Sequence, residues 1–293
     1  MTPELVLDAR VALGEGPLWD PARGILWWVD ILAGRVHGFD PATATDRVID
    51  VDTEVGCLAP MPDGRLLVGV TEAVAALEPV TGRLDPIVGF PPSTPRLRCN
   101  DGKCDPMGRF WVGRMAFDEA AGVGTLVRLD AERSPTPILG ELTCPNGLGW
   151  TADGRTMVFI DSPTRTVMRY PFDPTTGALG TGTPCLRLDA VEVPPTAVPD
   201  GLTIDAEDRL WVAVWGGGCV LRVGLDGDVL DRVDLPVSQP TSCTFGGPEL
   251  TDLYITSARQ GLGPDVLARE PFAGGLFRVR TTVHGRLADA FAA

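Results

Sequence analysis

The stretch VPDGLTIDAEDRLWVAV, from Val198 to Val214, determines the fold, because it contains one full copy of the unit that this chain repeats. Its first part, beginning at Asp200, has the composition of a strand. The polar residues Ala206-Glu207-Asp208 then predict a tight turn. Leu210 to Val214 is rich in bulky apolar residues and predicts a second strand. The unit is therefore strand, turn, strand.

Five other stretches follow the same plan, with a small polar turn before an aromatic or β-branched strand. They are PARGILWWVDI (Pro21 to Ile31), PDGRLLVGV (Pro62 to Val70), PMGRFWVGRM (Pro106 to Met115), ADGRTMVFID (Ala152 to Asp161) and ELTDLYITS (Glu249 to Ser257). The turn residues of successive copies lie 40 to 54 residues apart. Periods in this range, each with several short strands, are typical of propeller blades rather than helical solenoids.

Each copy has a third strand before the turn and another strand after it, so a short and poorly marked outer strand completes four antiparallel strands per blade. We therefore predict an all-β, six-bladed propeller that forms a single domain over residues 1–293. The N-terminal segment Glu4 to Arg10 is expected to pair into the last blade and close the ring, which protects its edges. A two-domain α/β fold is disfavoured, since no long amphipathic helical stretch occurs. We expect four tryptophans to pack between blades: Trp27, Trp28, Trp111 and Trp211.

The composition excludes several classes of partner. With 39 acidic and 25 basic residues, the formal net charge is −14, which repels nucleic acid and anionic membranes. No apolar stretch approaches the roughly 20 residues that cross a bilayer. The seven cysteines are scattered and are expected to be reduced. These features predict a soluble, cytoplasmic protein with no obligate protein partner evident.

Polar residues recur at one place in the strands that would line the propeller axis. Glu15, Asp101, Asn146 and Asp200 each precede a glycine at the same phase of the repeat. Several carboxylates around one axis are costly to bury without a compensating positive charge. Glu15, Asn146 and Asp200 would offer two carboxylates and one amide oxygen, a set suited to a divalent cation. The alternative is that these Asn-Gly and Asp-Gly pairs are only turn dipeptides.

Cysteine ligands are a second alternative for the axis. Five cysteines fall on the predicted inner strands: Cys57, Cys99, Cys104, Cys144 and Cys243. Strand alternation is expected to point Cys144 and Cys243 sideways, and buried cysteine is most often a small apolar filler. A thiolate site is therefore disfavoured.

Four longer insertions interrupt the compact repeat, and loops of this length are often functional. We expect several of them to surround the mouth of the central channel. They are Val88 to Leu97, Ala116 to Gly124, Ala190 to Pro199 and Ala258 to Gly275.

Over essentially its whole length the chain resembles the SMP-30/gluconolactonase/luciferin-regenerating-like family of six-bladed propellers. The resemblance is carried by LGEGPLW, RCNDGKCDPMGRFWVGRM, PNGLGW, PDGLTID with DRLWVAVWGGG, and SCTFGGPELTDLYITSAR. It implies one divalent cation, most often Ca²⁺, with Mg²⁺, Mn²⁺, Zn²⁺ and Fe²⁺ as alternatives. It implies Glu15, Asn146 and Asp200 as the ligands of that cation.

The resemblance also implies residues that contact the substrate. The R-x-N-D-G motif of the family corresponds to Arg98 and Asn100. An acidic residue that contacts the substrate in some sugar-lactone members falls near Asp118, with Glu119 adjacent. Two features depart from the family pattern and leave the substrate open. They are Cys99 and Cys104 on either side of Asn100, and the three glycines after Trp215.

The expected activity is metal-dependent hydrolysis of a sugar lactone, an aldonolactone, to the aldonic acid. Asp200 is our candidate for the general base, because a carboxylate that touches both the cation and a water molecule can accept a proton. Two alternatives remain open. One is a metal-dependent hydrolase of another ester or of a phosphotriester, and the other is a non-catalytic, calcium-stabilised propeller that binds a protein partner.

Overall fold

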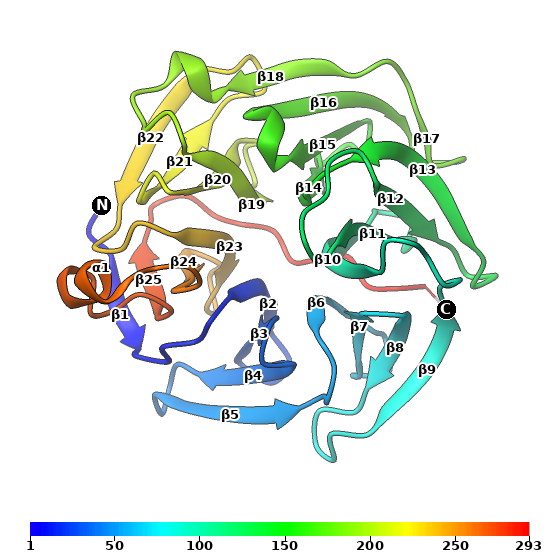
Figure 1. The fold of residues 1–293 in the computed structure, drawn as a ribbon, viewed down its shortest axis with the longest axis horizontal. Coiled ribbons are helices and arrows are strands. Elements are labelled where there is room, and N and C mark those ends of the chain that lie inside the picture. The colour runs from blue at the N-terminus through cyan, green and yellow to red at the C-terminus, as the bar shows by residue number, and fades with distance from the viewer. Residues whose placement is uncertain (293) are drawn as a thin grey trace.

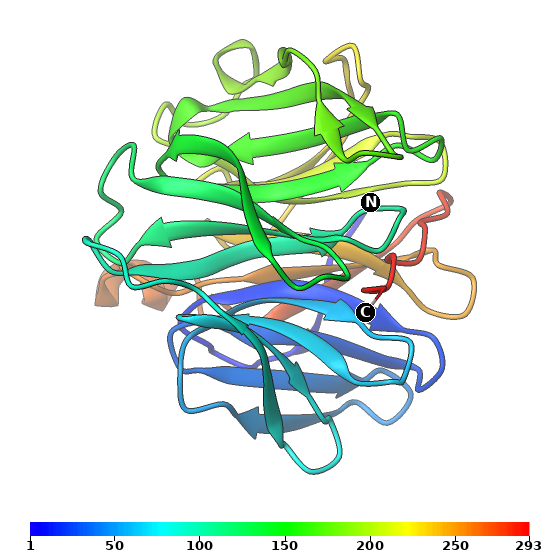
Figure 2. The same cartoon turned by 90° about the vertical axis from the view of Figure 1, so that its right-hand side faces the viewer.

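The computed structural model describes residues 1–292, so Ala293, the last residue of the predicted domain, lies outside it. Six antiparallel sheets surround a central axis (Figure 1), and the side view shows their strands crossing the thickness of the ring (Figure 2). The predicted six-bladed propeller with four strands per blade is confirmed.

The strands are grouped here by their layer, from the axis outward. The inner strands are β2 (Gly14–Asp20), β6 (Val55–Pro60), β10 (Leu97–Cys104), β14 (Pro145–Trp150), β19 (Val198–Ile204) and β23 (Pro240–Gly246). The second strands are β3 (Ile25–Asp30), β7 (Leu66–Val70), β11 (Phe110–Ala116), β15 (Thr156–Asp161), β20 (Leu210–Trp215) and β24 (Asp252–Ser257). The third strands are β4 (Arg35–Asp40), β8 (Ala73–Leu77), β12 (Gly124–Leu129), β16 (Thr166–Asp173), β21 (Cys219–Val223) and β25 (Leu276–Arg280).

Four of the outer strands have six or eight residues, so they are longer than the short outer strands expected from the sequence. The outer strands are β5 (Thr45–Asp50), β9 (Leu84–Gly89), β13 (Pro135–Leu142), β22 (Val229–Asp234) and, in the fourth blade, β17 (Ala178–Leu179) with β18 (Thr183–Arg187). Their side chains are mostly exposed or half-buried, so they carry no apolar run that marks them in the sequence. The helical segments are η1 (Ser162–Thr164), η2 (Leu188–Ala190) and α1 (Pro264–Arg269).

Strand β1 (Glu4–Leu7) closes the ring, as predicted. It pairs antiparallel with β25, Leu5 lying opposite Phe277, and so becomes the outer strand of the sixth blade. The Arg278 guanidinium donates a hydrogen bond to the Glu4 carboxylate at 2.8 Å. The first strand of the chain therefore completes a sheet made from its last three.

The core is divided among the interfaces between neighbouring blades. Alternate side chains of a strand point to opposite faces of its sheet, and here both faces are covered by other blades. This explains why strands such as β20, LWVAVW, are apolar throughout. The predicted interblade tryptophans are confirmed as core residues, since Trp28, Trp111 and Trp211 are fully buried and Trp27 is 3% exposed.

An aspartate before the turn provides a partner for the tryptophan of several blades. Asp205 Oδ2 accepts the Trp211 indole N–H at 3.0 Å, and its Oδ1 accepts two N–H groups of the turn backbone. Asp105 and Trp111 repeat this arrangement at 2.9 Å. The buried indoles of Trp111 and Trp211 therefore keep a hydrogen bond while the same carboxylates fix the turns. Within residues 1–292 no helix is long and apolar enough to cross a membrane.

Candidate active site

Irregular pairing in the inner strands places the polar residues of the repeat. In four blades the register between the inner strand and the second strand shifts where the polar residue and its glycine occur. The shifts lie between Glu15 and Leu18, between Cys99 and Gly102, between Pro145 and Leu148, and between Pro199 and Leu202. A bulge redirects a side chain that regular pairing would bury between sheets. The same local irregularity thus recurs at the axis in blade after blade.

A cavity of about 480 Å³ lies at the end of the ring where the inner strands begin. It brings together most of the site residues predicted from the sequence, namely Glu15, Arg98, Asn100, Asn146 and Asp200. These residues come from the first, third, fourth and fifth blades, and each is at most 7% exposed. The ring therefore gathers into one buried site residues that are far apart in the sequence.

The carboxylates of the axis are electrostatically strained. Burial raises the pKa of Glu15 well above its usual value, and the nearby charges of Asp200 and Asp101 raise it further. Burial and the charge of Asp101 likewise raise the pKa of Asp200. Each carboxylate accepts a hydrogen bond from the N–H of the glycine after it, as in the 2.8 Å bond from Gly16 to Glu15. This hydrogen bond lowers the pKa of Glu15, but burial raises that pKa by more.

A chain of hydrogen bonds fixes the amides of the site. Arg98 Nη1 donates to Asn100 Oδ1 at 2.7 Å, and Asn100 Nδ2 donates to Asn146 Oδ1 at 2.6 Å. Asn146 Nδ2 donates to Ser162 Oγ at 2.8 Å, and Ser162 donates to the Pro199 carbonyl at 2.7 Å. Ser162 therefore fixes the orientation of the Asn146 amide. The sequence reasoning missed Ser162, because it lies in η1, outside the repeat.

The chemistry of these donors fits a hard divalent cation. Glu15 and Asp200 contribute carboxylate oxygens and Asn146 an amide oxygen, and burial leaves the two carboxylates without a compensating cation in contact. No group of three or more His, Cys, Asp or Glu side chains within residues 1–292 is arranged to hold an ion. The candidate set therefore depends on the oxygen of Asn146.

The two acidic residues after β11 are both exposed, but only Glu119 lines the cavity. Asp118 does not line it, and its Oδ1 accepts the Ala120 N–H at 3.3 Å. Glu119 has a φ of 56°, in the left-handed region. The sequence does not reveal this backbone conformation, which is uncommon for a residue other than glycine.

Cys144 lies immediately before β14 and lines the cavity, contrary to the sideways orientation expected from strand alternation. Its Sγ lies 3.7 Å from Met115 Sδ. Burial, together with the charge of Asp200, raises the pKa of this thiol. All seven cysteines are free, which agrees with the predicted reduced state.

Three of the four long insertions reach the cavity. Glu119, Val198 and Gln260 come from these loops, while the insertion from Val88 to Leu97 contributes no lining residue. The remaining wall carries Trp215 and Gln239. The sequence analysis assigned no role to the two glutamines, since neither lies at the repeated polar position.

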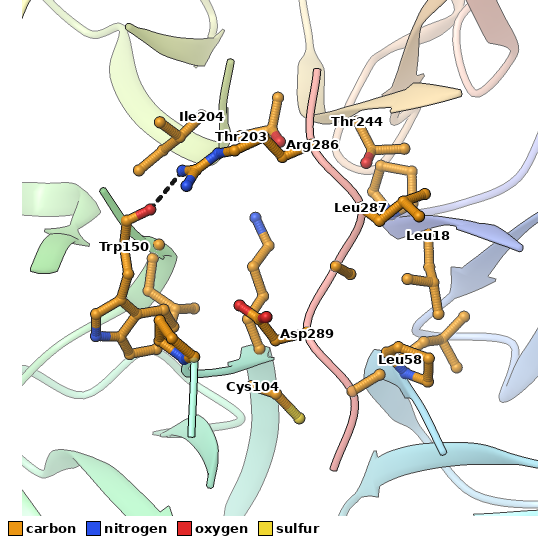
Figure 3. Close-up of a pocket in the computed structure, with 18 of the residues that line it drawn as sticks. Leu18, Leu58, Cys104, Trp150, Thr203, Ile204, Thr244, Arg286, Leu287 and Asp289 are labelled. Carbon is orange, nitrogen blue, oxygen red and sulfur yellow. Dashed lines mark hydrogen bonds between the residues drawn. The ribbon is translucent and has the colours of Figure 1, made fainter. Parts of the chain in front are cut away.

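The opposite end of the axis is crossed by the C-terminal segment. A second cavity of about 220 Å³ lies there. Figure 3 shows Arg286, Leu287 and Asp289 on the C-terminal segment, which runs across this cavity. Arg286 Nη2 donates to the Trp150 carbonyl at 2.6 Å (Figure 3), and Phe291 is fully buried beyond it. Lys103, which lines this second cavity, donates to the Leu202 carbonyl. The two cavities share no lining residue.

Comparison with known proteins identifies the family. The sequence model of the SMP-30/gluconolactonase/LRE-like region matches residues 13–259. The chain belongs to the SMP-30/gluconolactonase/LRE-like family. Among its relatives is the pentonolactonase XacC of Haloferax volcanii, 37% identical over 300 residues that cover 98% of this family member and 97% of the relative.

Two further relatives extend the comparison for this SMP-30/gluconolactonase/LRE-like protein. A 6-deoxy-6-sulfogluconolactonase of Pseudomonas putida is 34% identical over 294 residues and 99% of both chains. The crystal structure of a calcium-binding protein, regucalcin, from Agrobacterium tumefaciens superimposes with a TM-score of 0.93 at 29% identity, covering 99% of this chain and 97% of the other. The predicted family is thus confirmed.

Proposed function

We propose that this protein is a metal-dependent lactonase that hydrolyses a sugar lactone to the corresponding aldonic acid. Relatives named as lactonases, at 34% and 37% identity over nearly the whole chain, support lactone hydrolysis. The finer assignments, to a divalent cation and to individual residues, rest on the chemistry of the cavity.

The observation that carries the proposal is the excess of negative charge at the axis. Glu15, Asp101 and Asp200 are buried, and Glu119 lines the cavity mouth, against the two cationic side chains Arg98 and Lys103. Four carboxylates against two cations leave an excess of two negative charges. A divalent cation balances that excess, and Glu15, Asn146 and Asp200 are the oxygen donors that would hold it. Calcium is the favoured ion because every donor is a hard oxygen, and the calcium-binding relative agrees with this choice.

The chain's own residues supply the proton transfers. Bound at this site, a divalent cation provides a Lewis acid for the lactone carbonyl. Asp200 accepts a proton from the water that adds to the carbonyl carbon. The bond between that carbon and the ring oxygen then breaks, and Asp200 returns the proton to the ring oxygen, which becomes a hydroxyl. The products are the aldonic acid and the regenerated carboxylate.

Other residues would orient the substrate. Arg98 uses Nη1 for Asn100 and for the Cys99 carbonyl, so its other N–H groups remain for substrate oxygens. Glu119 at the mouth can accept hydrogen bonds from sugar hydroxyls. We assign to Glu119 the substrate contact expected near Asp118, because Glu119 lines the cavity and Asp118 does not.

The test is hydrolysis of a panel of neutral aldonolactones and a paraoxon-like phosphotriester by chelator-treated protein resupplied with Ca²⁺, Mg²⁺, Mn²⁺ or Zn²⁺. We expect lactone turnover that depends on the added ion. Asp200→Asn should lower kcat by at least about a hundredfold, in the range typical for loss of a general base. Glu119→Gln should raise KM, while Asp118→Asn serves as the matched control and should match the wild type.

Three outcomes would contradict parts of this proposal. Turnover of the phosphotriester alone would replace the lactone by another ester substrate. Thermal stabilisation by Ca²⁺ without turnover of any compound would favour the calcium-stabilised binding module. Full activity of Asp200→Asn would remove the assigned base.

A further inference from the structure

The side-chain amides of this chain are confined to one place. Only two asparagines and two glutamines occur in the 293 residues, and all four, Asn100, Asn146, Gln239 and Gln260, line the larger cavity. Asparagine and glutamine are ordinarily surface residues that solvate a fold. Since this chain uses none of them elsewhere, their position reflects what the cavity binds.

The two glutamines form a wall of their own. Gln239 directly precedes β23, and Gln260 follows β24, so both belong to the sixth blade. Arg98 and Asn100 lie on β10 of the third blade, across the ring in Figure 1. A ligand between these walls therefore meets the guanidinium on one side and two amides on the other.

Gln239 has an unused acceptor. Its Oε1 is buried and accepts no hydrogen bond from the residues that the structure describes. Its backbone carbonyl accepts the Ala258 N–H at 2.9 Å, so the main chain at this position is held in place. A buried amide oxygen without a donor is unfavourable. A hydroxyl of a bound ligand would supply that donor, and the amide nitrogen could donate to the next hydroxyl.

The charges of the cavity argue against an anionic group at this wall. The lining contains the carboxylates of Glu15, Asp200 and Glu119, and Arg98 is its only cationic side chain among the described residues. Arg98 lies on the far wall, where it is tied to Asn100. A phosphate or sulfonate beside Gln239 would therefore have no cationic side chain to pair with, and its loss of hydration would be uncompensated there.

An apolar surface borders the two amides. Trp215 lines the cavity and packs against the buried cluster that contains Leu13 and Ile31, which line the cavity too. The C–H face of a sugar chain can lie against such a surface while its hydroxyls reach the amides.

We propose that Gln239 and Gln260 bind the neutral hydroxyls on the side of the substrate that faces away from Arg98. The cavity thereby selects neutral aldonolactones over lactones that carry a phosphate, a sulfonate or a second carboxylate. This inference rests on the proposed lactonase function for the identity of the reaction. The binding of hydroxyls by Gln239 and Gln260 does not depend on that function.

The first experiment compares kcat/KM for glucono-1,5-lactone and its 6-phosphate. We expect the wild type to prefer the neutral lactone by at least about a hundredfold, and comparable rates, within about threefold, would overturn the proposal. Gln239→Leu should raise KM for the neutral lactone about tenfold, the effect of one lost hydrogen bond, with kcat nearly unchanged.

A variant that introduces a positive charge beside the substrate tests for a gain of function. Gln239→Arg introduces the missing cation and should raise kcat/KM for the 6-phosphate at least about tenfold while lowering it for the neutral lactone. Leu287→Arg, on an exposed residue at the opposite end of the axis, adds the same charge outside the cavity and should leave the preference unchanged. Equal effects of the two variants would contradict a local role for Gln239.

A binding measurement separates this inference from the proposed function. Calorimetric titration with glucitol, a neutral polyol that is not hydrolysed, should give binding that Gln239→Leu weakens about tenfold. Glucitol binding without turnover of any lactone would defeat the lactonase and keep the binding wall. Lactone turnover with KM and glucitol affinity unaffected by Gln239→Leu would defeat the wall and keep the lactonase.

Discussion

Glu15 and Asp200 are two buried acids whose pKa values are raised by burial and by neighbouring carboxylates, so ionising either one is unfavourable in the metal-free protein. A carboxyl group whose pKa is raised on folding binds protons more tightly in the native state. Its contribution to stability is fully present below the unfolded pKa, and it is lost as the pH rises through the folded pKa. Keeping these carboxyls buried therefore lowers the stability of the metal-free protein above the unfolded pKa, a cost that the proposed catalytic role would explain.

The first prediction concerns the pH dependence of the metal-free protein. In the presence of chelator, the melting temperature should fall as the pH rises from about 5 to about 8, because Glu15 and Asp200 must ionise while buried. Glu15→Gln removes one of these carboxyls, so the variant should melt at a higher temperature than the wild type at pH 8 and show a shallower slope. Thermal unfolding followed by circular dichroism measures both, and parallel curves for the two proteins would refute the explanation.

Residues that obey the repeat could be found from the sequence, and residues outside it could not. Glu15, Asn146 and Asp200 share one phase of the repeat, so alignment alone brought them together. Glu119 lies in a loop with a left-handed backbone, and Gln239 directly precedes β23, away from the repeated polar position. Neither feature leaves a periodic trace.

At the scale of the elements, close approach of the inner strands keeps the site compact. A Cβ atom added at Gly147 of β14 would lie 2.6 Å from the Asp200 carbonyl and 2.8 Å from the Leu202 nitrogen of β19. Both contacts are with backbone, which cannot move aside cheaply. Glycine at this position therefore sets the spacing between the fourth and fifth blades.

The second prediction tests this spacing. Gly147→Ala should destabilise the protein by about 1–3 kcal/mol, as overpacking does, because β14 and β19 must separate. Gly140→Ala is the matched control, since Gly140 lies in the exposed strand β13 with no atom within 4 Å of the added Cβ. That control should be neutral or slightly stabilising. Denaturant unfolding of both variants measures the difference, and equal stabilities would contradict the role of Gly147.

Elements were predictable where burial imposed a pattern. The inner and second strands are buried on both faces, so their apolar runs and turn residues marked them. The outer strands have at most one covered face, so polar and apolar residues are mixed along them. Their lengths could therefore not be predicted from the sequence. The division of the fourth outer strand into β17 and β18 had no signal in the sequence.

For the molecule as a whole, closure of the ring depends on β1. Its apolar residues Leu5, Val6 and Leu7 pack against the clusters on the two faces of the sixth blade. Without β1, the edge of β25 would be open and these clusters would be partly exposed.

The third prediction follows from this closure. Deleting residues 1–8 should lower the free energy of unfolding by about 3 kcal/mol. This value takes about 1 kcal/mol for the burial of each of three half-buried apolar side chains. At this chain length such a loss lowers the melting temperature by roughly 5–10 °C. Deleting only residues 1–3, which precede β1, should leave it unchanged. Differential scanning calorimetry compares the two, and an unaffected melting temperature in the longer deletion would show that the ring closes without β1.

The fold was predictable at this scale because a sixfold repeat admits few architectures. The crossing of the axis by residues 286–292 was not predictable, since that segment belongs to no blade and carries no motif.

The C-terminal segment that crosses the axis also limits how ligands can enter and leave the ring. Because Arg286 and Phe291 lie across the far end, we expect ligands of the larger cavity to enter and leave from the other end alone. For the proposed lactonase we therefore expect product inhibition, with the aldonic acid competing with the lactone for one binding site and one entrance.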